Sequence, residues 1–545
     1  MSRPGRNRAS ARRSRTALLL GAPLVFFAVF FAWPLVAILS RSLRPGAIAD
    51  VVTDPVLRRV AWFTLWQAVV STVLTLAAGL PAAYAVARYE FPGRRAFLAF
   101  VTVPFVLPTV VVATAFLALL RPGGLLAFLH WQRGVAPLLV AHVFFNLAVV
   151  VRIVGGFWAN LDRRREEAAR MLGASRRRVF RAVTLPLLMP SILAAATVVF
   201  LFSFTSFGAA LLLADPAHAT IEVEIYRQAI ELFDLHTAAA LALVQIVAVV
   251  AVVFALTRAQ ERFSYTQRLV GGVDARRRPQ GRERLVLAAI LGATALFLGG
   301  PLVVLVLRSL RAGGQWSLAA YRALGSSAST STLFVSPWTA IWNSLKFALI
   351  ATAIAIVVGG LASVAIAARP SRATRTVDTL LMLPLGTSAV TIGFGFLIAY
   401  QHAPHRLSSS FLLVPIAHAV VAIPFVVRAV VPALRSIDPR LRDAATTLGA
   451  SPRRVWREVD LPITARAFVV AAGFCAAVSL GEFGATLFIA RPDWPTVPIA
   501  IDRFLARPGQ IYVDQALAMS VILMLLTAGV VFAIERMRLR DPGAL

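Results

Sequence analysis

Two blocks of this sequence repeat one spacing of an acidic residue, a glycine, several arginines and a proline. They run from Glu167 to Pro186 (EAARMLGASRRRVFRAVTLP) and from Asp443 to Pro462 (DAATTLGASPRRVWREVDLP). In each block a glycine follows the acid by six residues, and glycine can adopt the positive φ angle that ends one helix and lets another begin. A proline suits the start of the next helix. The pattern predicts a short helix, a turn and a second helix on the surface, with no catalytic residues.

A carboxylate stands alone in an apolar stretch. Glu482 lies in the string GEFGAT, and an unpaired carboxylate is costly to bury in a membrane, which makes it a functional candidate. Glu482 and Phe483, with Ser206 and Phe207 at the corresponding place earlier in the chain, are our candidates for a substrate pathway. A cationic substrate would suit Glu482, with cation–π surface from Phe207, Phe483 and Trp494.

Two structural interpretations of Glu482 are at least as strong. The carboxylate pairs with Arg466 or Arg491, or it caps a helix break between Gly481 and Gly484. Glu482 therefore does not by itself predict a cationic substrate.

Composition shows that these residues belong to a membrane protein. The chain has 545 residues, 59% of them hydrophobic, and its mean hydropathy is +0.77, more apolar surface than a soluble domain can bury. Ala17 to Ser40 runs for 24 residues without a charge, enough for a helix to cross the bilayer. That run is too long for a signal peptide, so we expect an uncleaved first anchor. The single cysteine, Cys475, excludes a disulfide or a cysteine metal cluster within the chain.

Twelve apolar windows predict twelve membrane-spanning helices. They lie near 17–40, 61–87, 96–120, 135–158, 187–213, 236–257, 285–307, 341–368, 377–400, 411–434, 467–490 and 513–535. Pro104 and Pro108 are expected to kink the third span. The fold class is an all-α polytopic membrane protein.

The arginines predict the orientation of these spans. The net charge of +30 does not form one patch, which argues against a nucleic-acid partner. With a cytoplasmic N-terminus, 37 of the 55 basic residues fall in inside segments and 14 in outside segments, as the positive-inside rule requires. Both termini are therefore expected in the cytoplasm.

An internal repeat predicts two tandem units. An offset of 276 residues maps VAHVFFNLAVVVR, ending at Arg152, onto IAHAVVAIPFVVR, ending at Arg428, and also maps the two blocks described first. We expect a first unit at 1–257 with its loop at 160–186, a basic cytoplasmic linker at 258–284, and a second unit at 285–545 with its loop at 436–462. Six spans in each unit imply parallel orientation, with a pathway between the halves.

The repeated blocks resemble the EAA loop of binding-protein-dependent ABC importer permeases, and the resemblance extends over nearly the whole chain. It implies that each loop seats in a groove of an ATPase subunit. The docking residues that the resemblance carries over are Glu167, Ala168, Ala169, Gly173, Asp443, Ala444, Ala445 and Gly449. Asp443 departs from the glutamate of the pattern.

The same resemblance implies partners and a location. We expect two copies of a separate ATPase, an extracytoplasmic binding protein, and a multi-pass position in the bacterial inner membrane. The only lysine, Lys346, is not in a glycine-rich phosphate-binding loop, so we expect ATP and Mg²⁺ on the partner ATPases, no cofactor or metal in this chain, and no enzymatic activity of its own. A secondary transporter would need paired intramembrane carboxylates, and a scaffold would not need twin loops.

The substrate is the least determined feature. Residues 204–245 and 478–501 resemble thiamine permeases, ferric-iron permeases come next, and GEFGAT also resembles molybdate permeases, whose substrate is an anion. His402 and His405 are poor ferric ligands without nearby carboxylates. The acids Glu222, Glu224, Glu231 and Asp234 are expected in an outer loop, where they meet basic residues of a binding protein or are solvated.

Overall fold

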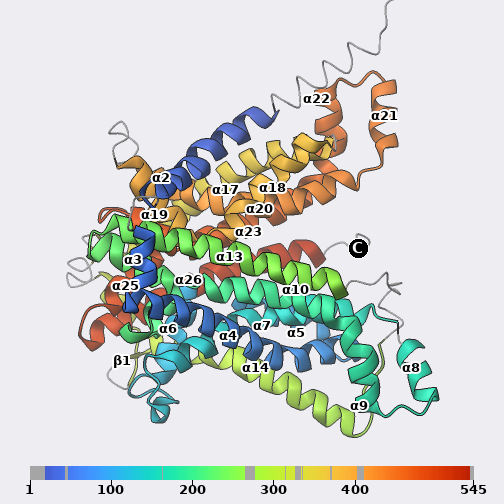
Figure 1. The fold of residues 1–545 in the computed structure, drawn as a ribbon, viewed down its shortest axis with the longest axis horizontal. Coiled ribbons are helices and arrows are strands. Elements are labelled where there is room, and N and C mark those ends of the chain that lie inside the picture. Colours follow the sequence, from blue (N-terminus) through green and yellow to red (C-terminus); the bar gives the residue numbers. More distant parts are fainter. Residues whose placement is uncertain are drawn as a thin grey trace, which may run out of the picture. The chain divides into compact units, whose positions relative to one another are not determined.

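The computed structural model describes most of the chain as helices (Figure 1). The described residues are 19–42, 47–162, 164–263, 276–312, 315–325, 333, 335–368, 371–401 and 410–539. Among them the strands are a single short hairpin, β1 (Arg311–Ala312) with β2 (Gln315–Trp316). The all-α fold class is confirmed.

The described helices give ten to twelve candidate membrane spans, which agrees with the prediction of about twelve. Ten described helical segments are long and apolar enough to cross a membrane, and two bent helix pairs raise the total to twelve. The ten segments are Leu19–Ser42, Pro55–Arg88, Val135–Ala159, Arg176–Phe204, Leu235–Arg262, Arg282–Ser309, Pro337–Ala368, Leu413–Arg435, Pro452–Gly481 and Gln510–Ile534. The bent pairs are Arg94–Val106 with Thr109–Leu120 and Arg372–Gly386 with Ala389–Tyr400. The parallel orientation of the two repeats stays a prediction.

The helices group into two compact units. Unit 1 comprises Met1–Arg44, Ala229–Ala239 and Tyr321–Leu545, and unit 2 comprises Pro45–Gln228 and Ala240–Ala320. The boundary between units passes through η5 (Arg227–Glu231) and α13 (Leu235–Phe263).

Unit 2 is built on the long helices α4, α7 and α10, which pack on one another. Its other elements include the first helix of the second half of the sequence, α14, which packs on α4 and α6. Its elements are α3 (Ala47–Thr53), α4 (Pro55–Arg88), α5 (Arg94–Val106), α6 (Thr109–Leu120), η2 (Ala127–Leu129), α7 (Val135–Ala159), α8 (Arg164–Met171), α9 (Arg176–Val179), η3 (Phe180–Thr184), α10 (Leu185–Phe204), α11 (Gly208–Leu213), η4 (Pro216–His218), α12 (Ile221–Tyr226) and α14 (Arg282–Ser309).

Unit 1 repeats this core with α17, α20 and α23. The first described helix of the chain, α2, belongs to this unit and packs on α19. Its elements are η1 (Ala28–Ala32), α2 (Trp33–Ser42), α15 (Ala319–Arg322, whose first two residues fall in unit 2), η6 (Ala323–Gly325), α17 (Pro337–Ala368), α18 (Arg372–Gly386), α19 (Ala389–Tyr400), α20 (Leu413–Arg435), α21 (Pro439–Thr447), α22 (Pro452–Val455), η7 (Trp456–Asp460), α23 (Leu461–Gly481), α24 (Gly484–Ile489), α25 (Val497–Leu505) and α26 (Gln510–Leu539).

One glycine contact recurs in both cores and shows how closely the helices approach. A Cβ built at Gly79 on α4 would lie 2.7 Å from Cβ of Val150 on α7. A Cβ at Gly359 on α17 would lie 2.8 Å from Cβ of Val426 on α20. Since helix association in lipid depends on close backbone packing at small residues, each glycine fixes the contact of the two central helices in its unit.

Four of the predicted spans are not single straight helices. The bend in the third span is 98°, and it comes between α5 and α6, where Pro108 precedes the first residue of α6. Its counterpart, α18 with α19, bends by 99°. Our spans at 187–213 and 467–490 were wrong as continuous helices, because α10 ends at Phe204 and α23 ends at Gly481 before short helices resume.

Candidate functional site: twin loops and buried polar clusters

The first loop of the repeat is a helical hairpin at one end of unit 2. Its helix α8 ends at Met171, and Gly173, two residues later, has a φ of +82°. The Gly173 N–H donates to the carbonyl of Arg170 (2.9 Å), and the Ala174 N–H donates to the carbonyl of Ala169 (3.1 Å). These two bonds form a Schellman motif, which satisfies the last carbonyls of a helix. Ser175 then caps α9 by accepting from the Arg178 N–H (3.4 Å).

The second loop, in unit 1, has the same geometry residue for residue. Gly449 has a φ of +81°, and its N–H donates to the Thr446 carbonyl (3.0 Å) while Ala450 donates to Ala445 (3.0 Å). Ser451 caps α22 through the Arg454 N–H (3.4 Å). The string LGAS therefore encodes a helix stop, a turn and a helix start in both loops.

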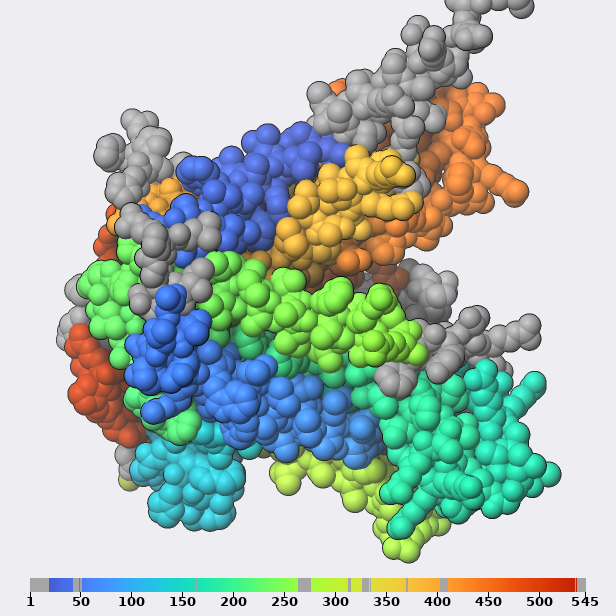
Figure 2. Space-filling model, in the orientation of Figure 1, coloured from blue at the N-terminus to red at the C-terminus, as the bar shows by residue number. Residues whose placement is uncertain are grey.

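Both loops expose apolar side chains at their tips. Leu172 is 89% exposed and Met171 is 88% exposed, and Leu448, which corresponds to Leu172, is 88% exposed. Glu167, Ala168, Asp443 and Ala444 are exposed beside them, while Ala169 and Ala445 are half-buried. The block that holds α8 and α9 stands out at the surface in Figure 2. Leu172 and Leu448 are therefore presented at corresponding positions on the surface of the two loops.

Each loop also contacts its own unit through a charged side chain, and the two side chains occupy corresponding positions in the repeat. In the first loop Glu166 pairs with Arg88 at the end of α4 and accepts from the Thr184 hydroxyl (2.9 Å). In the second, Arg442 corresponds to Glu166 and donates to Asp460 (2.6 Å), which corresponds to Thr184. The side chains differ in charge, but each contact joins the first helix of its loop to the π-helical turn that follows, η3 or η7.

The second helix of each loop is not a separate surface helix, which corrects our prediction. It begins at Arg176 and continues into the membrane as far as Phe204. One π-helical turn, η3, interrupts it, and the Leu185 N–H donates to the Phe180 carbonyl. Pro186, which has no N–H, is thereby accommodated inside the helix. The second loop repeats the π turn at η7.

The predicted pathway residues lie in the two helix breaks. In unit 1, Glu482 is buried between α23 and α24. Its carboxylate accepts from the N–H groups of Ala485 and Thr486 (2.9 Å each) and from the Thr486 hydroxyl (2.6 Å). His418 Nε2 lies 3.3 Å from the same carboxylate. This is the geometry of a helix cap, one of the two structural interpretations given above.

The aromatic candidates are packed inside the units. Phe483 and Phe207 are buried, and the Phe207 ring contacts Tyr226 at 5.8 Å between centroids. The Trp494 ring contacts Phe411 at 6.1 Å. Ser206, which corresponds to Glu482, is buried in the break between α10 and α11. Phe207 and Phe483 are therefore covered by their own unit rather than open to a cationic ligand, and Trp494 is half-buried.

Unit 2 contains a buried polar cluster that sequence reasoning missed. His142 Nδ1 lies 3.0 Å from the Ser71 hydroxyl, Asn146 donates to the Ser203 hydroxyl (3.4 Å), and Gln67 donates to the Ser203 carbonyl (2.9 Å). His142 Nε2 and Gln67 Oε1 have no partner among the described residues. The available signal was the histidine repeated in VAH and IAH, since His142 corresponds to His418.

The two corresponding histidines, His142 and His418, differ in their hydrogen-bond partners. His418 Nδ1 lies 2.7 Å from the Ser479 hydroxyl, and Nε2 lies 2.8 Å from the Thr486 hydroxyl. In unit 2, Ala210 replaces Thr486 at the corresponding place. The second half therefore carries a fully bonded network where the first half leaves acceptors and donors unused.

The prediction of solvated outer-loop acids was wrong for Glu222 and Glu224, whereas Glu231 is exposed and Asp234 is half-buried. Glu222 and Glu224 are buried, on α12. Gln245 donates to Glu222, and Gln228 donates to Glu224 (2.7 Å). A hydropathy window cannot detect a one-and-a-half-turn helix that folds back into the protein. His402 and His405 lie outside the described residues.

The comparisons with known proteins agree with this geometry. Residues 75–265 match the family described as binding-protein-dependent transport system inner membrane component. The thiamine transport system permease protein ThiP of Brucella abortus is 27% identical over 98% of this chain and 97% of its own length, and that of Escherichia coli is 26% identical over 88% and 89%.

A solved structure is also similar, that of a bacterial ABC transporter involved in the import of the acidic polysaccharide alginate. It covers 48% of this chain and 100% of its own, at 18% identity and a TM-score of 0.40. The family match, the full-length similarity to ThiP proteins and the helical fold together confirm the resemblance. Residues 75–265 match the inner membrane component of binding-protein-dependent transport systems, and the chain is similar over nearly its whole length to permeases of such ABC importers.

Proposed function

We propose that the two loops dock two copies of an ABC ATPase, one on each loop, and that ATP and Mg²⁺ bind to those partners. The observation that carries this proposal is the pair of leucines, Leu172 and Leu448, held almost fully exposed at the tips of two identical Schellman turns. An apolar side chain on a rigid helical tip suits a groove in a partner. The neighbouring acids and alanines named above complete the docking surface.

Replacing Leu172 and Leu448 by serine is expected to reduce ATPase co-purification by about tenfold or more. Each leucine that leaves water on docking contributes about 1.5–3 kcal/mol, and tenfold in affinity corresponds to about 1.4 kcal/mol. The measurement is the amount of ATPase retained on the tagged permease. Phe233→Ser is the control, because Phe233 is 80% exposed but lies in a loop outside the docking blocks. Equal retention by the leucine variant and the control would contradict the docking proposal.

We propose thiamine as the substrate, delivered by an extracytoplasmic binding protein. Several relatives that are similar over most of the chain are thiamine transport permeases by name, and the residues around both helix breaks resemble that group. Buried polar groups near the breaks, such as His142, Asn146 and Glu482, offer hydrogen-bonding side chains inside the membrane region. Ferric iron is the alternative, and it lacks a supporting site, since the described residues contain no cluster of three or more potential metal ligands.

The binding protein that works with this permease provides the test. We expect it to bind thiamine tightly and ferric ion weakly or not at all, as measured by calorimetry with each ligand. We also expect cells that lack their own thiamine transport to take up labelled thiamine when the whole transporter is expressed. Tight ferric binding without thiamine binding would overturn the choice of substrate and leave the docking proposal untouched.

The remaining predictions complete this assignment. The chain is proposed to lie in the bacterial inner membrane with both termini in the cytoplasm, because the basic residues gather in the segments that this orientation places inside. The docking loops then face the cytoplasm, where an ATPase is available. Hydrolysis belongs to the partner, so we propose that this chain has no enzymatic activity of its own.

A further inference from the structure

A cavity of about 810 Å³ lies behind the first docking loop, within unit 2. Its walls come from the end of α4, the end of α7, the loop itself, the start of α14 and the short segment before α14. This volume falls in the range of small-ligand sites. The cavity is lined by apolar, aromatic and basic side chains, together with the carboxylates of Glu166 and Glu167 and the Thr184 hydroxyl.

The apolar wall faces the region of the membrane-spanning helices. Ala77, Leu80 and Pro81 on α4 line it together with Val286 and Ile290 on α14. Val286 is more than half exposed. This wall therefore extends to the surface of the unit, where a hydrocarbon chain could lie against it.

The basic wall comes from the loop and the segment before α14. Arg170 and Arg176 line the cavity, and neither forms an ion pair with any described residue. Arg88 is buried in its ion pair with Glu166. Arg277 pairs with Glu283, which raises the pKa of Arg277. The lining has more arginines than carboxylates, so an anion is favoured there.

The aromatic side chains supply a separate sign of a missing ligand. Trp158 lines the cavity, is only 4% exposed, and contacts Tyr84 at 5.3 Å between ring centroids. Its indole N–H has no hydrogen-bond partner among the described residues. A buried donor without an acceptor costs free energy, and indoles of this kind favour the membrane interface, where one edge meets a polar group.

We propose that this cavity binds the headgroup phosphate of an anionic phospholipid. The phosphate meets Arg170 and Arg176, an ester or glycerol oxygen accepts from Trp158, and the first carbons of an acyl chain lie along Leu80 and Val286. A soluble phosphate ester shares the headgroup chemistry but leaves the apolar wall uncovered. The apolar wall therefore favours the lipid as the source of the phosphate.

The second half of the sequence lacks this site. Leu434 corresponds to Trp158, Thr446 to Arg170 and Pro452 to Arg176. The indole donor and both arginines are therefore features of the first loop alone. Because the second loop has the same backbone geometry without them, these side chains are not needed for the fold of a docking loop.

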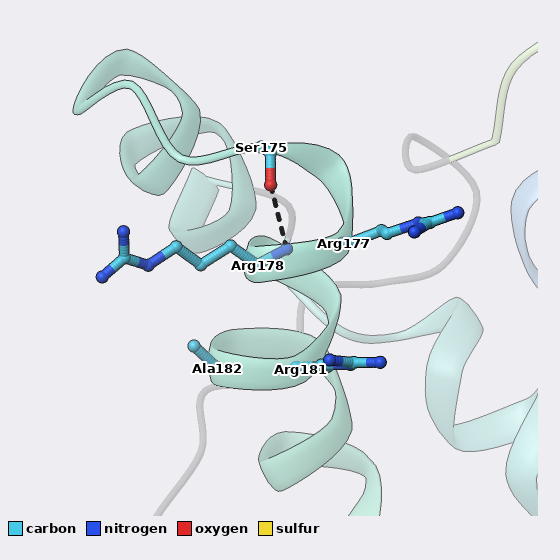
Figure 3. A pocket seen from close by; sticks show the side chains of 5 residues that line it. All are labelled: Ser175, Arg177, Arg178, Arg181 and Ala182. Atoms are coloured by element: carbon cyan, nitrogen blue, oxygen red, sulfur yellow. Dashed lines mark hydrogen bonds between the residues drawn. The ribbon is translucent and has the colours of Figure 1, made fainter.

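A nearby set of arginines provides the control. Arg177, Arg178 and Arg181 line a different hollow of about 400 Å³, with Ser175 and Ala182. Figure 3 shows Arg177 and Arg181 extending to one side of the helix and Arg178 to the other. These arginines carry the same charge as Arg176 and lie close to it in the sequence, but they do not line the cavity that contains Trp158.

The experiment is native mass spectrometry of the permease–ATPase complex after purification with added phosphatidylglycerol or phosphatidylcholine. The wild type is expected to retain one phosphatidylglycerol and to retain phosphatidylcholine weakly. The double variant Arg170→Thr, Arg176→Pro copies the second loop, with proline at a first helical position that tolerates it. Each arginine near an anionic lipid contributes about fivefold in affinity, so loss of both is expected to reduce retention by about twenty-five-fold.

The variants separate a specific site from general attraction. Arg177→Gln with Arg178→Gln is expected to retain the lipid, and Trp158→Phe, which keeps the ring and removes the N–H, is expected to weaken retention. ATPase co-purification is expected to stay normal in Trp158→Phe, because Trp158 lies on α7 outside the docking loop, so loss of lipid in this variant distinguishes a failure here from a failure of docking. Equal loss in both arginine pairs, or no loss in the Arg170 and Arg176 pair, would overturn the proposal. Displacement of the lipid by millimolar glycerol 3-phosphate or inorganic phosphate would also overturn it.

Discussion

Transport and ATPase association are expected to be lost when both docking glycines are replaced, in the variant Gly173→Val with Gly449→Val. Both glycines have φ near +80°, a conformation that costs an ordinary L-residue about 1–2 kcal/mol and a β-branched residue more. Valine would also break the N–H geometry of the Schellman turn. The tip leucines would then lose their fixed direction, while the membrane spans would insert as before.

Asparagine separates backbone strain from side-chain bulk. Asparagine tolerates the left-handed conformation better than other non-glycine residues, and there is open space around both glycines for a Cβ. Gly173→Asn with Gly449→Asn is therefore expected to keep most ATPase binding. The measurements are co-purification, transport and membrane yield. Normal co-purification of the ATPase with the double valine variant would rule out the docking assignment.

Glu482→Ala is expected to destabilise the whole protein rather than alter substrate affinity alone. The change removes the acceptor of two backbone N–H groups and one hydroxyl at a buried helix break. Each unsatisfied N–H costs about 1–3 kcal/mol, and lipid offers no replacement acceptor. The measurement is the midpoint of thermal unfolding of the purified protein, which is expected to fall by several degrees.

Ser206 provides the matched control for this prediction. It occupies the corresponding place in the first half, and Ser206→Ala removes a smaller group from a break that is not capped by a carboxylate. We expect its unfolding midpoint to stay close to that of the wild type. If Glu482→Ala unfolds at the wild-type temperature but no longer transports, the cap is not the role of Glu482, and contact with the substrate is favoured.

The docking loops were predictable because their geometry is local. The string LGAS specifies a helix stop at a glycine and a helix start at a serine, and both bonds of the Schellman turn join residues within five positions of each other. The loop before each fifth span and the twelve apolar segments follow from similarly local patterns. These patterns do not predict the π-helical turn before Pro186, because a helix can accommodate the missing N–H of a proline in more than one way.

Features that depend on distant residues were less accessible. A hydropathy window places Glu222 in a polar loop, but the structure buries it beside Gln245 on another helix. A hydropathy average also joins α23 and α24 into one span, so it does not show where the helix break that Glu482 caps lies. The sequence offers a repeated histidine at 142 and 418, but not the hydroxyl groups that meet it, because those come from other helices.

Because α2 packs with helices from the second half of the sequence, the order of synthesis limits when unit 1 can assemble. This helix is among the first made, but its packing partner α19 begins at Ala389. At roughly 5–20 residues per second, the ribosome needs on the order of twenty to seventy seconds to supply that partner. During that time the span Leu19–Ser42, which contains α2, must persist in the bilayer without that partner, which the charge-free run from Ala17 to Ser40 allows. Assembly of unit 1 is therefore completed only late in synthesis, whatever the order in which its other helices enter the membrane.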